Sequence, residues 1–142
     1  MRHFDLGGVI SGEILPASPS DPTVSRPFPH SVVWRDGDST FTDVSGNYLL
    51  PGVTSGETIR TAFRSPYMQA INLAGPAGVR STTAPGSSPL DLHWTVSASD
   101  TSERNAYFHG LLTHDYMKAL DPGFTVIDYR MPCTVNILSL IH

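Results

Sequence analysis

One segment near the C-terminal end has the pattern of a long helix, and it constrains the fold more than any other stretch. Residues 102–122 read SERNAYFHGLLTHDYMKALDP, with no proline before the last position. Hydroxyl and carboxylate side chains at 99–102 suit the start of a helix, and Pro122 with Gly123 suits its end. The sequence therefore predicts one helix over 102–120 in a chain otherwise built of short strand-like runs.

The predicted helix is apolar on two sides. At about 100° per residue, Phe108, Leu112 and Tyr116 share one side, which we expect to pack against the strands. Tyr107 and Leu111 fall near the opposite side, and we expect them to stay exposed in an isolated chain. A second apolar side requires a second partner, from later residues, another subunit or further sequence, so Tyr107 and Leu111 are candidate interaction residues.

Before the helix, short runs alternate apolar and polar side chains, as half-buried strands do. Six such runs lie at 8–14, 31–34, 40–53, 57–63, 67–73 and 90–96. The connection 16–29 carries five prolines and is neither helix nor central strand. The pattern predicts a mainly β fold, a β-sandwich with one long C-terminal helix and a short trailing strand.

The strongest local turn signal is TFTDVSGNYLLPGV at 40–53, which predicts a hairpin. Asp43 is placed to accept hydrogen bonds from loop N–H groups, and Gly46 is suited to a positive φ. Tyr48 then resumes the alternation of a strand.

Residues 7–73 resemble the carboxypeptidase regulatory-like, transthyretin-like β-sandwich modules of many secreted proteins. The resemblance rests on GVISG at 8–12, on the proline-containing connection and on TDVSGNYLLPGV at 42–53. It implies a Greek-key, transthyretin-like sandwich in which Asp43, Gly46 and Tyr48 are structural, the turn setting the register and the tyrosine entering the core. It implies little about function, because such modules serve as spacers, enzyme appendages, adhesins and carbohydrate binders.

Three parts follow from these patterns. Residues 1–73 form the β-sandwich module, and 74–89, rich in Gly, Pro and Ser, form a loop or linker. Residues 90–142 hold a strand, the helix and a C-terminal strand or tail, with an apolar run at 137–142.

Composition excludes several functions. Nine basic against 13 acidic residues give a net charge of -4 without a basic run, which argues against nucleic acid as a partner. No window is apolar enough for a membrane span, and the single cysteine, Cys133, excludes an internal disulfide. We expect a secreted protein whose signal peptide would lie upstream of this chain.

No catalytic or cofactor site is predicted. His109 and His114 are five residues apart, about 140° around a helix, which does not suit a shared zinc ion, so no metal ligand and no cofactor is assigned. Nucleophile elbows and phosphate-binding loops are absent from the sequence. Trp34 and Trp94 are candidates for stacking on sugar rings, although core packing is the commoner use of such residues.

Residues 103–136 also resemble the long helix and following strand that precede the zinc site in thermolysin-like and fungalysin-like secreted metallopeptidases. The resemblance rests on ERNAYFHGLLTHDYMKAL, PGF and MPCTVN. It implies that zinc is bound farther downstream by a His-Glu-x-x-His helix, yet no His-Glu pair occurs in this chain. We expect no peptidase activity here, and the chain is either the front part of such an enzyme or a descendant in non-catalytic use.

Three functions follow. The first is a non-catalytic extracellular region that serves spacing, folding or protein–protein interaction, with a missing C-terminal catalytic region as its partner. The second is a structural subunit that assembles with copies of itself into a fibre or surface layer. The third is a carbohydrate-binding module that binds glycans through Trp34 and Trp94.

Overall fold

The computed structural model describes residues 2–97 and 99–137, and this part of the chain contains ten strands and one helix. In chain order they are β1 (His3–Ile14), β2 (Val24–Pro27), β3 (Val32–Arg35), β4 (Asp38–Phe41), β5 (Asn47–Thr54), β6 (Thr58–Ala62), β7 (Met68–Asn72), β8 (Val79–Thr83), β9 (Leu92–Trp94), α1 (Thr101–Leu120) and β10 (Met131–Val135). The prediction of a mainly β fold with one C-terminal helix is confirmed.

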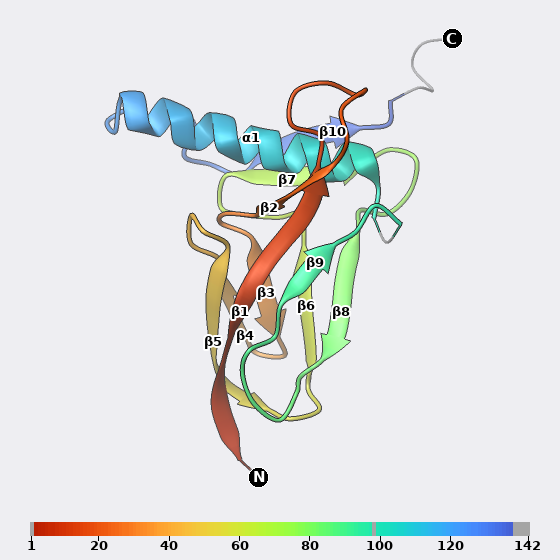
Figure 1. The fold of residues 1–142 in the computed structure, drawn as a ribbon. Helices are drawn as coiled ribbons and strands as arrows, with labels where there is room; N and C mark the ends of the chain where they lie inside the picture. The colour runs from red at the N-terminus through yellow and green to blue at the C-terminus, as the bar shows by residue number, and fades with distance from the viewer. Residues whose placement is uncertain (1, 98, 138–142) are drawn as a thin grey trace.

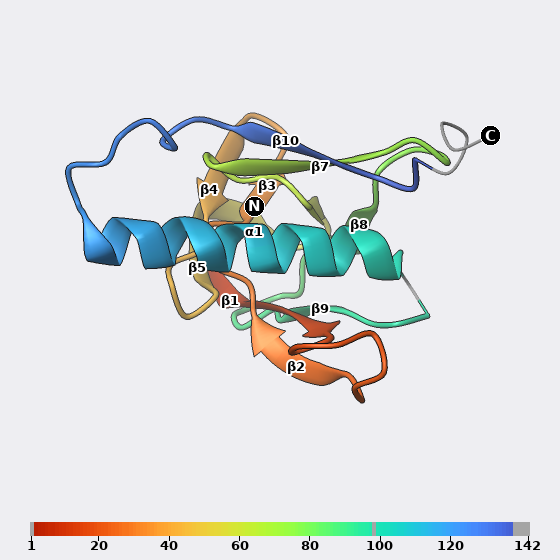
Figure 2. The same cartoon turned by 90° about the horizontal axis from the view of Figure 1, so that it is seen from above.

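Two sheets form the body of the molecule (Figure 1). One has the order β2-β1-β5, with β9 also paired to β1, and the other has the order β4-β3-β6-β8. The long strand β1 changes partners along its length, pairing with β5 up to Val9 and with β2 and β9 beyond it. A third, parallel pair, β7 with β10, runs alongside α1, and the helix lies across one end of the two sheets (Figure 2).

Aromatic side chains fill the junction between the sheets and the helix. Phe63, which follows β6, packs on Trp94 of β9 with ring centroids 4.2 Å apart. Phe28 contacts the rings of Tyr107 and Phe108. The inward side chains of β1, β5 and β6 complete the core: Leu6, Ile10, Ile14, Tyr48, Leu50, Val53 and Ile59.

The start of α1 is fixed by polar contacts. The Asp100 carboxylate caps the helix by accepting from the Glu103 N–H at 3.0 Å. Arg104 is fully buried, and its guanidinium donates to the carbonyl oxygens of Glu13 at 2.8 Å and Ser99 at 2.7 Å. These bonds hold the first turn of α1 against the end of β1, because a buried guanidinium needs its donors satisfied.

The predicted sides of the helix are exchanged in the structure. Tyr107 and Leu111, expected to be exposed, are fully buried, whereas Leu112 and Tyr116, expected to be buried, are exposed. Only Phe108 lies as expected. The reason is that half of the buried side of α1 is polar, being made by Glu103, Arg104, Tyr107, Phe108, Leu111 and His114. The distribution of apolar residues alone therefore indicates the wrong side of α1 as the buried one.

Two further expectations need correction. The hairpin predicted at 40–53 is wrong, because β4 pairs with β3 while β5 pairs with β1, so the turn at 43–46 carries the chain from one sheet to the other. The loop or linker expected at 74–89 contains β8, which pairs with β6 through its whole length. The trailing strand is β10, and positions 138–142 of the apolar tail lie outside the described residues.

Candidate functional site

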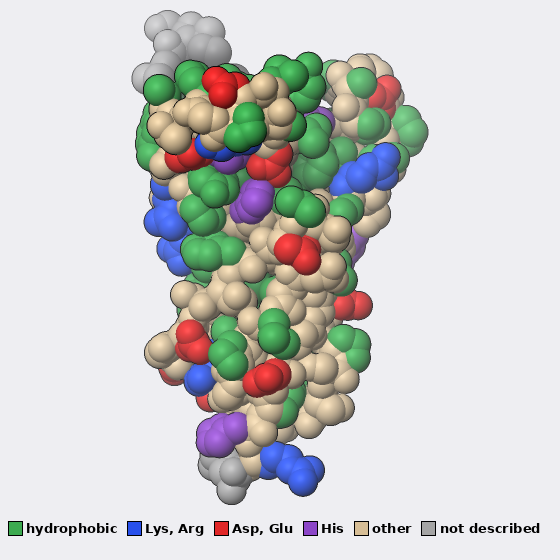
Figure 3. All heavy atoms as spheres, turned by 90° about the vertical axis from the view of Figure 1, so that its left-hand side faces the viewer, with side chains coloured by type: hydrophobic (Ala, Val, Ile, Leu, Met, Phe, Trp, Pro, Cys, Tyr) green, Lys and Arg blue, Asp and Glu red, His purple; other side chains and the backbone are tan. Residues whose placement is uncertain are grey.

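The outer side of α1 carries a row of exposed apolar side chains. Leu112, Tyr116 and Leu120 recur every fourth residue and are 53%, 64% and 70% exposed. This spacing keeps them on neighbouring positions of one helix side, away from the buried side. Figure 3, which views the molecule from the C-terminal end of α1, shows hydrophobic side chains interspersed with acidic, basic and histidine side chains over this end. We call these three residues the α1 stripe.

A network of histidine and aspartate side chains anchors the C-terminal half of α1 on its buried side. His114 is buried, and its two ring nitrogens lie 3.1 Å from Asp115 Oδ1 and 3.0 Å from Asp128 Oδ1. The ring of His114 therefore bridges the two carboxylates.

Two more basic side chains, His30 and Lys118, complete this network. His30 Nε2 lies 3.0 Å from each oxygen of Asp115, and Lys118 Nζ lies 2.8 Å from Asp128 Oδ2. The hydrogen bonds from Lys118 and His114 lower the pKa of Asp128. The backbone of His30 is left-handed, with φ 58°, a conformation that costs free energy for a residue other than glycine. The network thus ties α1 to the segment before β3 and to the loop before β10.

This network is suited to holding structure. Both ring nitrogens of His114 and Nε2 of His30 lie within hydrogen-bond distance of a carboxylate, and no serine, threonine or cysteine side chain is hydrogen-bonded to either ring within the described chain. Across residues 2–97 and 99–137, no group of three or more His, Cys, Asp or Glu side chains is arranged to hold a metal.

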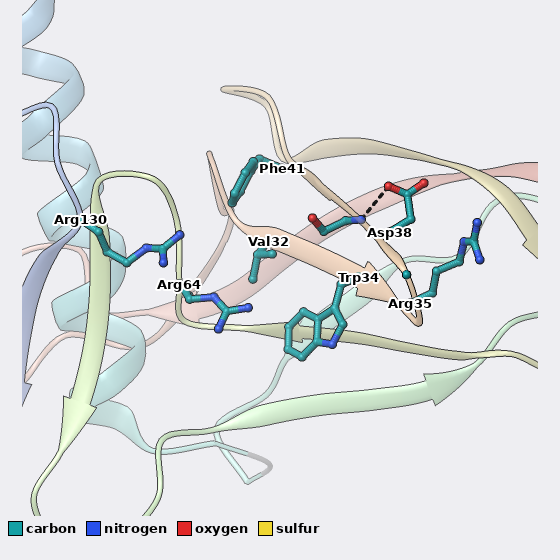
Figure 4. Close-up of a pocket in the computed structure, with 9 residues that line it drawn as sticks. Val32, Trp34, Arg35, Asp38, Phe41, Arg64 and Arg130 are labelled. Carbon is teal, nitrogen blue, oxygen red and sulfur yellow. Dashed lines mark hydrogen bonds between the residues drawn. The ribbon is translucent and has the colours of Figure 1, made fainter.

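The second candidate region is an open groove on the outer face of the β4-β3-β6-β8 sheet, with a volume of about 490 Å³ (Figure 4). Val32 and Trp34 of β3 and Phe41 of β4 supply apolar surface. Two arginines lie on its other side: Arg64, which follows β6, and Arg130, which precedes β10. The Arg64 guanidinium lies over the indole of Trp34, with Cζ 5.2 Å from the ring centroid. We call this region the Trp34 groove.

The predicted interaction residues separate into two groups. Tyr107, Leu111 and Trp94 are buried in the core, so the expectation that they are available to a partner or a sugar is wrong. They pack where α1 meets the sheets, a contact that sequence alone did not place. Trp34 is half-buried in the groove, but Arg64 covers a face of its ring.

The turn residues Asp43, Gly46 and Tyr48 lie together. Asp43 Oδ1 accepts from the N–H groups of Ser45 and Asn47, both at 2.9 Å, and the bond from Asn47 is the main cause of a lowered Asp43 pKa. Gly46 has φ 80°. The Tyr48 ring is buried and its hydroxyl donates to the Leu90 carbonyl at 2.6 Å. Burial raises the pKa of the Tyr48 hydroxyl well above its usual value.

Sequence reasoning missed the arginines of the groove and the histidine network. The alternation of 57–63, extended by one residue, puts Arg64 on the same face as Arg60, so the sequence held a signal for Arg64. Nothing local joins Arg130 to that face, or His30 to Asp115, because these contacts connect segments distant in sequence.

Comparison of this chain with protein families, with curated proteins and with solved structures finds no match. Within the described residues, no helix has the length and apolar character needed to span a membrane.

Proposed function

We propose that this chain is a non-catalytic, extracellular β-sandwich region that binds a partner protein through the α1 stripe. The observation that carries the proposal is the exposure of Leu112, Tyr116 and Leu120 on a helix whose opposite side is already packed. Burying three such side chains supplies on the order of 5 kcal/mol, enough to contribute substantially to a stable interface.

The anchoring of the helix supports this proposal. Arg104 at the start of α1 and His114 in its second half are both buried and both hydrogen-bonded to other segments. Rotating α1 to bury the stripe would pull both side chains out of their hydrogen bonds, at a cost of several kcal/mol. The stripe therefore stays outward unless another protein surface covers it.

The resemblance of 103–136 to secreted metallopeptidases supports a catalytic region of that kind as the partner of the α1 stripe. There the corresponding helix and strand brace the subdomain beside the catalytic cleft, and zinc is bound by a separate His-Glu-x-x-His helix. We commit to a metallopeptidase-like catalytic region as the occupant of the α1 stripe, belonging to the same polypeptide or to a second one. This partner also accounts for a chain without a His-Glu pair.

Site-specific photo-crosslinking in the cells that make the protein tests this proposal. The photoreactive residue p-benzoylphenylalanine replaces Tyr116, and in a matched control it replaces Leu49, which is 59% exposed on β5. Mass spectrometry of the crosslinked peptide from position 116 is expected to identify a polypeptide with a His-Glu-x-x-His sequence, and the size of the product shows whether it is the same chain. No such peptide is expected from position 49.

Two results would overturn the proposal. A crosslink from position 116 to another copy of this chain would favour the self-assembling subunit instead. Equal crosslinking from positions 116 and 49 would show that the stripe has no dedicated partner.

A further inference from the structure

Three arginines line the Trp34 groove: Arg35 pairs with Glu57 at 3.4 Å, whereas Arg64 and Arg130 have no carboxylate to pair with among the described residues. Arg64 and Arg130 reach the same side of Val32 from different segments (Figure 4). Neither takes part in an ion pair with a described residue. The acidic side chain of the groove, Asp38, accepts instead from the N–H of Ser39 at 2.8 Å. Adjacent unpaired cations repel each other, so an anion bound between them is favoured.

Both guanidinium groups are positioned and still have free donors. Arg64 stacks on Trp34 and forms no hydrogen bond with a described residue through its guanidinium. Arg130 donates its Nε–H to the Ser65 carbonyl at 2.8 Å, which leaves its two terminal NH₂ groups available. A guanidinium held in place loses less conformational entropy on binding and matches a planar carboxylate with two parallel hydrogen bonds.

Part of the surface beside these arginines is apolar. Val32, Trp34 and Phe41 line it, and Phe41 is 40% exposed although it projects from a strand of the sheet. The groove volume of about 490 Å³ lies within the range of small-molecule sites. A ligand whose body is apolar would displace water from Phe41, whereas a bare inorganic anion would leave that surface wet.

From these three features we infer that the Trp34 groove binds an organic carboxylate with an apolar or aromatic body. The carboxylate lies between Arg64 and Arg130, and the body lies over Val32 and Phe41. A sugar stacked on the covered face of the indole would have to displace Arg64, so a neutral carbohydrate fits the site less well. A free acid and the C-terminal end of a peptide carry the same chemistry, and the experiment below separates them.

Titration of the whole chain followed by NMR chemical shifts tests the inference with 3-phenylpropionate as the probe. We expect saturable shifts at the Trp34 indole N–H and at the backbone of Arg64 and Arg130. The matching amide, 3-phenylpropionamide, and inorganic phosphate are each expected to bind at least about tenfold more weakly. Tripeptides ending in phenylalanine, as free acid or as amide, show whether a chain end is the better source of the carboxylate.

Three variants make the test specific to the groove. Arg64→Gln and Arg130→Gln should each weaken binding about tenfold. Arg60→Gln is the matched control, because Arg60 lies opposite Trp34 on the neighbouring strand and does not line the groove. Its variant should bind like the wild type.

The inference is overturned by any of three results. The first is equal binding of acid and amide, the second is phosphate binding as tight as that of 3-phenylpropionate, and the third is loss of binding in Arg60→Gln as large as in Arg64→Gln. Because the wild-type shifts alone locate the ligand, a variant that fails to fold does not decide the outcome. None of these results bears on the α1 stripe.

Discussion

The ring of His114 lies flat against the ring of Tyr67, with centroids 3.9 Å apart and planes inclined by 16°. The same imidazole bridges Asp115 and Asp128. A helix position that an apolar side chain would normally occupy is thus filled by an imidazole ring, which is stacked on an aromatic ring and hydrogen-bonded on both edges. This arrangement fixes the rotation of α1 and keeps the α1 stripe outward.

Replacing the bridging imidazole tests its contribution to stability. His114→Ala should lower the free energy of unfolding by about 2 kcal/mol, because two carboxylates lose a donor and Tyr67 loses its stacking partner. His109→Ala is the control, since His109 makes one bond, to the Leu15 carbonyl at 2.8 Å, and should cost about 1 kcal/mol. Urea denaturation measures both, and an equal loss would contradict a special role for His114.

Asp128 should make stability sensitive to acid. Hydrogen bonds from Lys118 and His114 hold the Asp128 pKa below its ordinary value of 3.8. The folded state then releases this proton more readily than the unfolded state, so the stabilisation is present above pH 3.8 and is lost as pH falls through the lowered pKa. Asp128→Asn should be less stable than the wild type at neutral pH, and the difference should shrink in acid. A difference independent of pH would contradict this assignment.

The contribution of Glu103 to stability should change with pH in the opposite direction from that of Asp128. Burial raises the pKa of its carboxyl group above the ordinary value of 4.5, against a hydrogen bond from the Gly78 N–H that lowers it. The folded state therefore holds this proton more tightly, and its contribution to stability falls as pH rises through the raised pKa. Glu103→Gln keeps an acceptor for Gly78 and stays neutral. Its melting temperature relative to the wild type should rise between about pH 4 and pH 7, and a constant offset would refute the prediction.

Alanine substitutions at Gly46 and Gly37 distinguish the cost of a steric clash from the cost of backbone strain alone. Both have positive φ, 80° and 84°, but a Cβ at Gly46 would lie 2.6 Å from the Ile10 carbonyl oxygen, whereas nothing lies within 4 Å of one at Gly37. Gly37→Ala should cost about 1 kcal/mol of strain. Gly46→Ala should cost about 3 kcal/mol, because the backbone oxygen of β1 cannot move aside easily. Thermal denaturation compares the two, and similar losses would mean that the turn relaxes.

Local patterns were enough to predict the strand content and the helix. Alternation marked most strands, and the helix begins one residue before its predicted start and ends at the predicted residue, Leu120. These features depend on side-chain periodicity and capping, which act over a few residues. The parallel pairing of β9 with β1, by contrast, joins Leu92 to Ile10 and has no local signal.

Local sequence patterns could not predict the orientation of α1 or the two candidate sites, and the reason is physical. Polar residues made half of the buried side of α1, and Arg104 and His114 are tolerated there only because distant segments supply acceptors. Whether such acceptors exist depends on the assembled fold. The same holds for the Trp34 groove, where Arg64 and Arg130 meet only after β7 and β10 pair.

Hydroxyl-radical footprinting of the α1 stripe tests the central claim most directly. The labelling of Leu112, Tyr116 and Leu120 is measured in the purified chain and in the protein within the cells that make it, with the exposed Leu49 as an internal reference. We expect strong labelling of the stripe in the purified chain and strong protection in the cells, with Leu49 labelled alike in both. Equal labelling of the stripe in the two settings would contradict this expectation.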